Sequence, residues 1–302
     1  MRRLLSVLTG VVVGVVVTAT PAWAEPDPTP NHVWTSGGNV IYEAGLSRVN
    51  QVVVSAPATN KVAFTDISGI IVGQGCVQGA TSHEAVCTVT ANSSFQLDIH
   101  LGSKNDTLEI VSSLSYAFTN VYAGAGSDTV NFGALSSKFG QADGGPGNDT
   151  LTAPSTSNVV LLSLDGQDGA DTMCGGRGAL AQYTSRTAAV NVSLDGTAND
   201  GETGEGDNVC ATIGGVNASP YADVLSTGTA AARLYGNGGD DRLYGNWGND
   251  KLDGGAGADR LYGGSGDDDL TGGAGADLLD GGLGYADFCH EDALDTVTNC
   301  EL

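Results

Sequence analysis

Basic residues are scarce in this chain. Twelve lysines and arginines stand against 35 aspartates and glutamates, which gives a formal net charge of −23. Such a surface repels nucleic acid and anionic lipid and attracts cations. The acidic excess does not indicate disorder, because 40% of the residues are hydrophobic and fall at ordered places. The composition therefore argues for a cationic ligand, with no nucleic-acid partner and no membrane insertion.

Sequence motifs of common enzyme classes are missing as well. The four histidines form no H-E-x-x-H motif, since His83-Glu84 is followed by Ala-Val-Cys, and there is no G-x-S-x-G elbow or P-loop. Gly73–Gly79 misses the dinucleotide fingerprint by one residue and lacks a following helix pattern. We expect no enzyme, although abundant carboxylates leave a glycosidase-type acid pair open.

Beyond the N-terminus, no apolar run is long enough to cross a membrane. The N-terminal run, Leu4 to Val17, follows Arg2 and Arg3 and leads to Ala22-Trp23-Ala24. A basic start, a short apolar core and an A-x-A site are typical of a cleaved secretory signal peptide. We therefore expect residues 1–24 to be removed, residues 25–30 to form a flexible leader, and the mature chain to be secreted and extracellular.

Cysteine is infrequent but even in number. An even count in an exported chain favours disulfides over metal ligation. Six cysteines allow 15 pairings, and sequence alone does not decide among them. We favour the nearest-neighbour pairing of the residues in chain order, namely Cys76 with Cys87, Cys174 with Cys210, and Cys289 with Cys300.

Glycine is the residue in excess, at 46 of 302, and it falls in a repeat. From Ala218 to Cys289 the chain divides into eight consecutive units of nine residues. The sixth position is aspartate except at Ala232 and Ala286. The eighth is always large and apolar: Leu225, Leu234, Leu243, Leu252, Leu261, Leu270, Leu279 and Phe288. Two fixed phases over this length indicate a repeating structure with eighth positions that point inward.

Each unit reads as a turn followed by a short strand. Glycines at positions 1, 2 and 4 permit positive φ and close backbone approach, and positions 7 to 9 form a strand whose middle side chain points inward. Two units make one coil of 18 residues. Aspartates 18 apart therefore stack on one edge, with Asp241, Asp259 and Asp277 on the first edge and Asp250 and Asp268 on the second.

Stacked carboxylates need a cation between the coils. Adjacent strands lie about 4.8 Å apart, and like charges at that distance repel. Ca²⁺ accepts six to eight carboxylate and carbonyl oxygens in irregular geometry, whereas Mg²⁺ demands a strict octahedron and Zn²⁺ prefers His or Cys. One buried leucine per nine residues stabilises less than ordering them costs, so ion binding must contribute to folding.

These units resemble a known family. Gly254-Gly-Ala-Gly-Ala-Asp-Arg-Leu-Tyr262 and the unit after it are similar to the G-G-x-G-x-D-x-U-x nonapeptide of the hemolysin-type calcium-binding, or repeats-in-toxin, family. The resemblance implies an all-β fold, a right-handed parallel β-roll with Ca²⁺ held between turns over residues 218–289. The pattern fails at Ala232, and Asp287 falls at position 7 of the last unit.

These departures from the nonapeptide pattern decide which pairs of aspartates we expect to bind Ca²⁺ well. We expect good sites at the pairs 241/259, 250/268 and 259/277. A site at 223/241 is doubtful. Sites at 232/250 and 268/286 are expected to be defective.

A longer repeat precedes the roll. Four glycine-containing turns end in aspartates spaced 22, 21 and 22 residues apart. Each aspartate is followed by Thr and then an apolar residue. This spacing predicts a wider solenoid from about residue 100, with aspartates on one edge only. Whether they bind Ca²⁺ or only cap turns is left open. The predicted metal residues are Asp106, Asp128, Asp149, Asp171, Asp223, Asp241, Asp250, Asp259, Asp268 and Asp277.

The remaining segments carry weaker signals. Short strands are expected at 40–42, 51–54 and 61–64 within a β-rich region covering 31–217. The acidic stretch 195–208 has the composition to hold an ion but lacks the EF-hand pattern; we favour a surface loop there and leave the ion site as the alternative. Residues 290–302 leave the nine-residue register and are expected to cap the last coil.

Together these features favour a secreted calcium-binding structural or interaction module that folds on meeting extracellular Ca²⁺. A glycan or protein partner is compatible with it. One alternative is an extracellular enzyme acting on polysaccharide, because parallel β-helices carry polysaccharide lyases. A lytic toxin is disfavoured, since the chain has no long amphipathic or apolar membrane segment.

Overall fold

The structure is a computed structural model that describes residues 30–301, except for 47, 59, 90–94, 113–116, 134–138, 156–160 and 285. Every regular element in these ranges is a β-strand. The expected signal peptide and residues 25–29 of the leader lie outside the described residues. In the ranges just given, no helix has the length and apolar character needed to span a membrane.

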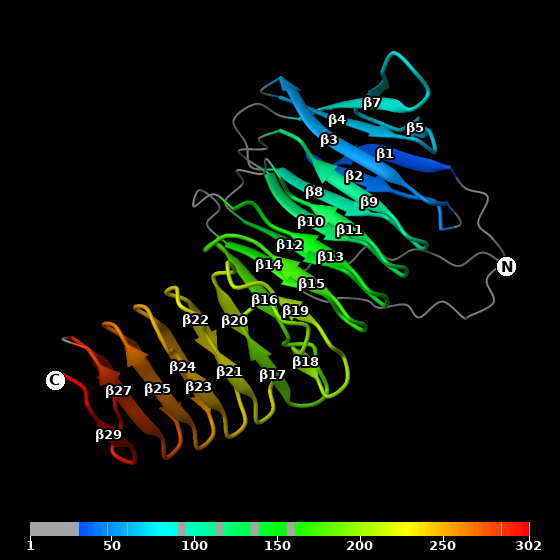
Figure 1. Ribbon diagram of the computed structural model, residues 1–302. Helices are drawn as coiled ribbons and strands as arrows, with labels where there is room; N and C mark the ends of the chain where they lie inside the picture. The colour runs from blue at the N-terminus through cyan, green and yellow to red at the C-terminus, as the bar shows by residue number, and fades with distance from the viewer. Residues whose placement is uncertain are drawn as a thin grey trace, which may run out of the picture.

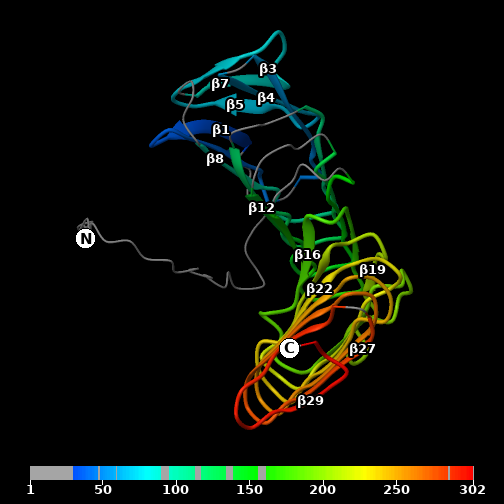
Figure 2. The ribbon, with the colours of Figure 1, turned by 90° about the vertical axis from the view of Figure 1, so that its left-hand side faces the viewer.

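The strands wind into a parallel β-solenoid that runs from the N-terminal to the C-terminal end of the molecule (Figure 1). One long sheet extends along its whole length, and two shorter sheets succeed each other on the facing side. Figure 2 shows the coils of the C-terminal part lying over one another as flattened rings. The all-β solenoid expected from the sequence is therefore confirmed.

Within each of the three sheets, every strand is hydrogen-bonded to the strands next to it in the orders that follow. The long sheet has thirteen strands: β28 (Phe288–His290), β26 (Asp269–Ala274), β24 (Lys251–Ala256), β22 (Arg233–Tyr235), β20 (Gly215–Asn217), β16 (Ala179–Gln182), β14 (Leu161–Asp165), β12 (Phe139–Asp143), β10 (Ala117–Tyr122), β8 (Phe95–His100), β2 (Asn39–Glu43), β1 (Asn31–Ser36) and β5 (Ile70–Val72). The second has nine: β19 (Asn208–Val209), β15 (Thr172–Cys174), β13 (Thr150–Thr152), β11 (Thr129–Asn131), β9 (Thr107–Ile110), β3 (Gln51–Ala58), β4 (Lys61–Asp66), β7 (Glu84–Thr88) and β6 (Cys76–Gln78). The third has seven: β18 (Gly201–Glu202), β17 (Val190–Ser193), β21 (Val224–Ser226), β23 (Arg242–Tyr244), β25 (Arg260–Ser265), β27 (Leu278–Leu283) and β29 (Thr296–Thr298).

Antiparallel pairs form the N-terminal end. Strand β1 pairs with β2, and β3, β4, β7 and β6 pair in succession. The inward residues of these strands are buried. Tyr42 and Phe64, for example, are fully buried, and their stacked rings have centroids 5.7 Å apart. Alternating apolar residues in these strands produce this one-sided burial. The three strands expected at 40–42, 51–54 and 61–64 lie in β2, β3 and β4.

The wide coils follow from β8 onward. Thr107 of β9 lies beside Thr129, Thr129 beside Thr150, and Thr150 beside Thr172, so the structure confirms the predicted spacing of 22, 21 and 22. These coils bury many side chains. Residues 95–110 alone bury six hydrophobic ones: Phe95, Leu97, Ile99, Leu101, Leu108 and Ile110.

The facing sheet changes where the wide coils meet the roll. After β16 the chain enters β17, which starts the third sheet, and then turns back through β18 to β19, the last strand of the second sheet. Strand β20 follows in the long sheet. This excursion separates Thr172 from its neighbour Asn208 by 36 residues. A strict repeat is therefore invisible in this part of the sequence.

The roll has the 18-residue coil that the repeat predicts. Leu243 lies beside Leu261 and Leu252 beside Leu270, and the eighth-position leucines from Leu225 to Leu279 are completely buried. Gly255 and Gly264, at position 2, have φ of 100° and 103°, in the left-handed region that glycine tolerates best. The sequence pattern thus accounts for the inward column and for the turns that frame it.

The last unit of the roll differs from the prediction. Phe288, expected to point inward, is 57% exposed, and Cys289 lies beside Leu270 instead. The turn before it holds one residue more than in the other units, which moves each following residue by one place. Residues 290–301 then continue the solenoid, because β29 pairs with β27 in parallel.

All six cysteines are paired. The bonds join Cys76 to Cys87, Cys174 to Cys210 and Cys289 to Cys300. This is the nearest-neighbour set favoured from the sequence. The first lies between antiparallel strands at the N-terminal end, the second at the junction of the wide coils with the roll, and the third at the C-terminal end. The disulfides thus lie at both ends and at the junction.

Candidate metal centre

The ten predicted metal residues share one place in the fold. Each ends a turn and is followed directly by a strand, as Asp106 is followed by β9. All are exposed by 3% or less: Asp106, Asp128, Asp149, Asp171, Asp223, Asp241, Asp250, Asp259, Asp268 and Asp277. Buried carboxylates need hydrogen bonds or a counter-charge, so their partners decide what they do.

The carboxylates are stacked by backbone hydrogen bonds. The N–H of Asp241 donates to Oδ1 of Asp259, one coil further on, at 2.8 Å, and the N–H of Asp259 donates to Oδ1 of Asp277 at 2.8 Å. On the opposite edge, the N–H of Asp250 donates to Oδ1 of Asp268 at 2.7 Å. We call such a column an aspartate ladder. The predicted stacking of aspartates 18 apart on two edges is confirmed.

The wide coils carry a third ladder, on one edge. The N–H of Asp106 donates to Oδ1 of Asp128 at 2.6 Å, that of Asp128 to Asp149 at 2.7 Å, and that of Asp149 to Asp171 at 2.7 Å. Its members precede strands of the nine-stranded sheet, as the first ladder of the roll precedes strands of the seven-stranded sheet. The two ladders therefore occupy equivalent edges of the solenoid.

The second carboxylate oxygen of most of these residues has no partner. Oδ2 is buried without a hydrogen bond in Asp106, Asp128, Asp149, Asp171, Asp241, Asp259, Asp268 and Asp277. A buried carboxylate oxygen without a donor is costly. Each of these atoms therefore requires a proton or a cation.

Burial shows which form these groups take without a metal. Desolvation raises the pKa of Asp149, Asp171 and Asp241 to about 7, and that of Asp259 to about 6. The neighbouring aspartate in the ladder adds to the rise, for example Asp277 beside Asp259. At neutral pH the metal-free ladder is thus poised between protonated and charged forms, and a divalent cation relieves the same penalty.

In the roll, glycine at position 1 leaves a small space beside the orphaned oxygen. A methyl group on Gly263 would lie 2.6 Å from Oδ2 of Asp268 and 2.5 Å from the carbonyl oxygen of Gly281, which belongs to the next coil. A methyl on Gly254 would likewise crowd Oδ2 of Asp259 and lie 2.8 Å from the carbonyl oxygen of Gly272. We call this space the glycine cradle.

The chemistry of the cradle fits Ca²⁺. A carboxylate oxygen from one coil and a carbonyl oxygen from the next meet there, and Ca²⁺ prefers both kinds of oxygen. Within the described ranges, no three His, Cys, Asp or Glu side chains come together in a metal-binding group. An ion between coils would therefore depend on backbone carbonyls as well as aspartates. Zn²⁺ does not suit such a ligand set.

Comparison with known families agrees with this geometry. Four copies of a family model, the RTX calcium-binding nonapeptide repeat, match residues 163–179, 218–252, 226–261 and 253–285. These stretches of the chain carry calcium-binding repeats of the RTX type. Three of the RTX matches lie in the roll, and the fourth spans the turn of Asp171 in the wide coils. No curated protein matches the chain.

Asp223, the first aspartate of the first ladder in the roll, has protein donors for both of its carboxylate oxygens. Asp223 Oδ2 accepts the N–H of Ser219 at 2.9 Å, and Oδ1 accepts the Ser219 hydroxyl at 2.7 Å. This carboxylate has the donors that Asp241 and Asp259 lack. On the second ladder, Ala232 provides no carboxylate, and the Thr227 hydroxyl lies 3.5 Å from Oδ2 of Asp250.

At the C-terminal end of the second ladder, one expectation proved wrong. Asp287 was expected to fall out of the ladder, leaving Asp268 to face Ala286. Instead, the N–H of Asp268 donates to Oδ1 of Asp287 at 2.9 Å, because the longer turn shifts Asp287 into the sixth position. Asp295 extends the other ladder in the same way, accepting from the N–H of Asp277 at 3.1 Å.

The acidic stretch 195–208 is not simply a surface loop. Asp200 and Asp207 are exposed by 2% and 0%. Oδ1 of Asp207 accepts the N–H of Asp171 at 2.8 Å, which makes Asp207 the next rung of the third ladder, and the Tyr183 hydroxyl donates to its Oδ2 at 3.0 Å. The expectation failed because these contacts come from residues 24 and 36 positions away.

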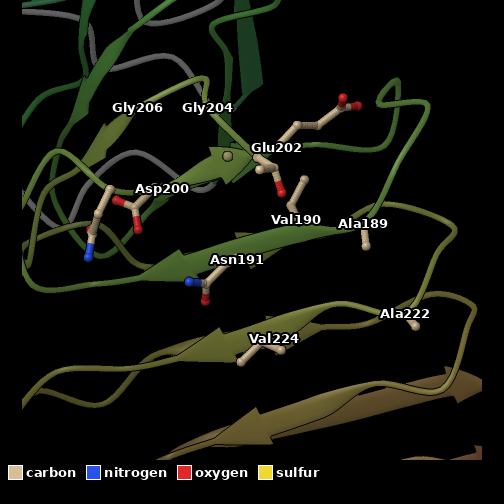
Figure 3. Close-up of a pocket in the computed structure, with 12 residues that line it drawn as sticks. Ala189, Val190, Asn191, Asp200, Glu202, Gly204, Gly206, Ala222 and Val224 are labelled. Carbon is tan, nitrogen blue, oxygen red and sulfur yellow. The ribbon is translucent and has the colours of Figure 1, made fainter.

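A hollow of about 450 Å³ lies beside this stretch (Figure 3). Val190, Asn191 and Val224 line it from β17 and β21, and the hairpin of Asp200 and Glu202 overhangs them. Both oxygens of Asp200 accept backbone N–H groups, from Ser193 and Val209. This carboxylate therefore lacks the orphaned oxygen that marks the RTX cradles.

The position-1 glycines were not predicted as part of the site. In the sequence they have the character of turn formers, whereas the structure shows that their missing side chain creates the cradle. The donors Ser219 and Tyr183, which satisfy Asp223 and Asp207, were not predicted either. The spacing of five residues between glycine and aspartate was visible in the sequence. The cross-coil donors carried no local signal.

Proposed function

We propose that this RTX-type protein is an exported module that binds several Ca²⁺ ions between its coils and completes its fold outside the cell. The ions would lie in the cradles of the pairs 241/259, 259/277 and 250/268. The observation that carries this proposal is the buried, partnerless Oδ2 facing a glycine cradle in each pair. When bound, Ca²⁺ supplies the positive charge that these oxygens require.

Secretion is part of the proposal and has its own support. The first 24 residues have the sequence of a signal peptide, and all six cysteines form disulfides, which persist in oxidising compartments. Low cytosolic free Ca²⁺ would leave the roll unfolded before export. In this proposal the chain is a structural or interaction module and not an enzyme.

Calcium titration of the purified mature chain tests the proposal. We expect the far-ultraviolet circular dichroism of the chelated protein to gain β-structure as Ca²⁺ is added, with a midpoint of about 10⁻⁴–10⁻³ M, as for extracellular calcium modules. Mg²⁺ at equal concentration should give little change, because it tolerates irregular coordination poorly. A spectrum that responds to neither ion, or equally to both, would contradict the proposal.

A saccharide is a second candidate ligand, favoured by one observation. A hollow of about 420 Å³ lies over the outer face of the long sheet, lined among others by Tyr122, Gln141 and Gln182. The Tyr122 ring stacks on His100 at 4.8 Å, and Gln141 Nε2 donates to the Tyr122 hydroxyl at 3.1 Å. A fixed aromatic face beside planar amides suits sugar rings and hydroxyl groups.

Glycan-array binding separates this candidate from the first. We expect the Ca²⁺-loaded chain to bind a subset of polysaccharides and Tyr122→Ala to lose at least tenfold in affinity. Tyr262→Ala, which removes a stacked tyrosine of the roll, is the control and should bind normally. Equal loss in both variants, or no glycan binding by the parent chain, would rule out the saccharide.

A further inference from the structure

The outer face of the seven-stranded sheet carries basic and aromatic residues, in a chain whose net charge is −23. Arg242 of β23 lies beside Arg260 of β25, and Tyr244 lies beside Tyr262. The two tyrosine rings are stacked, with centroids 5.2 Å apart. Both arginines are exposed, and both tyrosines are half-buried. We call these four residues the arginine–tyrosine strip.

The two arginines of the strip have no counter-charge. Neighbouring strands lie about 4.8 Å apart, so like charges on adjacent strands repel each other. Within the described residues, neither guanidinium takes part in an ion pair or a hydrogen bond. Asp280 is the one acidic residue in β21, β23, β25 and β27, all of which are fully described, and it accepts a hydrogen bond from Asn299 at 2.8 Å. Folding alone does not account for this pair of arginines.

The opposite sheet of the same coils neutralises its basic residues. At the equivalent position of the repeat, Arg233, Lys251 and Asp269 follow one another in adjacent strands. The Lys251 ammonium lies 3.0 Å from Oδ2 of Asp269, and Nε2 of His290 lies 2.9 Å from its Oδ1. On the seven-stranded sheet, the residue that follows the two arginines is Leu278 instead. The repeat therefore does not itself require unpaired arginines.

The hollow of Figure 3 adjoins one end of the strip. Val224, which lines this hollow, lies beside Arg242 in the sheet. Three other lining residues, Ala189, Val190 and Ala222, are also apolar. The two carboxylates of the overhanging hairpin already accept backbone N–H groups of the chain. The hollow therefore suits an apolar side chain rather than a charged ligand.

This combination of residues is typical of a protein–protein interface. Arginine, tyrosine and tryptophan contribute most to binding at such interfaces, and Trp247, three residues after Tyr244, is 64% exposed. Val224 and Leu278 lie at the two ends of the pair of arginines. Apolar side chains of a polypeptide can cover these residues, whereas a hydrophilic polysaccharide has none.

Charge then selects the kind of polypeptide. At physiological salt, exposed charges act over about 8 Å, so the field at the strip is set by its own arginines more than by the distant acidic residues. Arginine pairs with carboxylates through two parallel hydrogen bonds. The complementary partner is therefore acidic.

We propose that the arginine–tyrosine strip and the adjoining hollow bind an acidic segment of a partner protein. Carboxylates of this segment pair with Arg242 and Arg260, and an apolar side chain enters the hollow beside Val224. The inference rests on the proposed function as an interaction module and names the chemistry of its partner. Because β23 and β25 belong to the roll, the segment binds only when Ca²⁺ is present.

Binding of a random copolymer of glutamate and tyrosine to the immobilised full chain, with Ca²⁺ and intact disulfides, tests the proposal. We expect Arg242→Gln combined with Arg260→Gln to lower the affinity about tenfold. The matched control, Arg233→Gln combined with Lys251→Gln, changes the net charge equally on the other sheet and should bind as the parent does. Ala222→Gln, which fills the hollow without adding charge, should also weaken binding.

Three results would overturn the proposal. The first is a parent chain without affinity for the copolymer, and the second is an equal loss in the two double variants. The third is a different occupant. Heparin binding that exceeds copolymer binding and depends on Arg242 and Arg260 would assign the strip to an anionic polysaccharide. Self-association in sedimentation that depends on them would assign it to a second copy of the chain.

Circular dichroism during Ca²⁺ titration keeps this test separate from that of the proposed function. Each variant should gain the same β-structure as the parent, because the substituted side chains lie on the outside of the coils. A parent chain that does not respond to Ca²⁺ contradicts the proposed function itself. A folded, Ca²⁺-loaded parent that does not bind the copolymer contradicts only the inference about the strip.

Discussion

Replacing Asp259 by asparagine is expected to change stability in opposite directions with and without Ca²⁺. In Ca²⁺ the variant should lose about 3–5 kcal/mol, the usual cost of removing one partner of a buried charge pair. Asp259 takes part in two stacked pairs, with Asp241 and Asp277, and its Oδ2 is the oxygen that faces the cradle. The amide keeps the shape and removes the charge.

In chelator at pH 8 the same variant should be more stable than the parent. Burial raises the pKa of Asp259 to about 6 from an ordinary value of 3.8. The folded chain therefore holds a proton that the unfolded chain releases, and the metal-free protein loses stability as pH rises from about 4 to 6. Asparagine has no proton to lose, so the variant avoids this loss. At pH 4 the two metal-free proteins should differ little.

Denaturant unfolding measures the loss in Ca²⁺. In chelator, where the roll is largely unfolded, circular dichroism at pH 4 and pH 8 measures how much β-structure the variant and the parent each retain. Asp253→Asn is the matched control, because Asp253 lies on the outward face of β24 in the same coil and is only partly buried. It should shift stability by less than about 0.5 kcal/mol in every condition. A variant of Asp259 that is destabilised equally with and without Ca²⁺ would show that its role is in packing alone.

The roll was predictable because each nine-residue unit makes one turn and one strand. The inward column from Leu225 to Leu279 and the stacks of Asp241 with Asp259 and of Asp250 with Asp268 followed from two phases in the sequence. Local geometry repeats whenever the local sequence repeats. The prediction failed at Asp287, where one extra residue in a turn changed the phase.

The junction was not predictable, because its contacts join distant segments. Asp207 continues the ladder of Asp171 after a gap of 36 residues, and Tyr183, which caps it, lies 24 residues away. No repeat in the sequence connects the two members of such a pair.

Removing Ca²⁺ should unfold the roll and leave the first wide coils folded. Residues 95–110 bury six hydrophobic side chains, whereas the coil from Leu243 to Arg260 buries only Leu243 and Leu252. At roughly 1.5–3 kcal/mol for each buried side chain, the difference amounts to several kcal/mol per coil. The roll also stacks charged carboxylates that no protein donor satisfies. Its coils therefore depend on the ion most strongly.

Amide hydrogen exchange of the full chain, resolved by peptide, tests this dependence most directly. With Ca²⁺ bound, we predict slow exchange throughout residues 95–110 and 236–283. After chelation, residues 236–283 should exchange at the rate of an unfolded chain while residues 95–110 remain protected, and added Ca²⁺ should restore the difference. A roll that stays as protected in chelator as in Ca²⁺ would contradict the account.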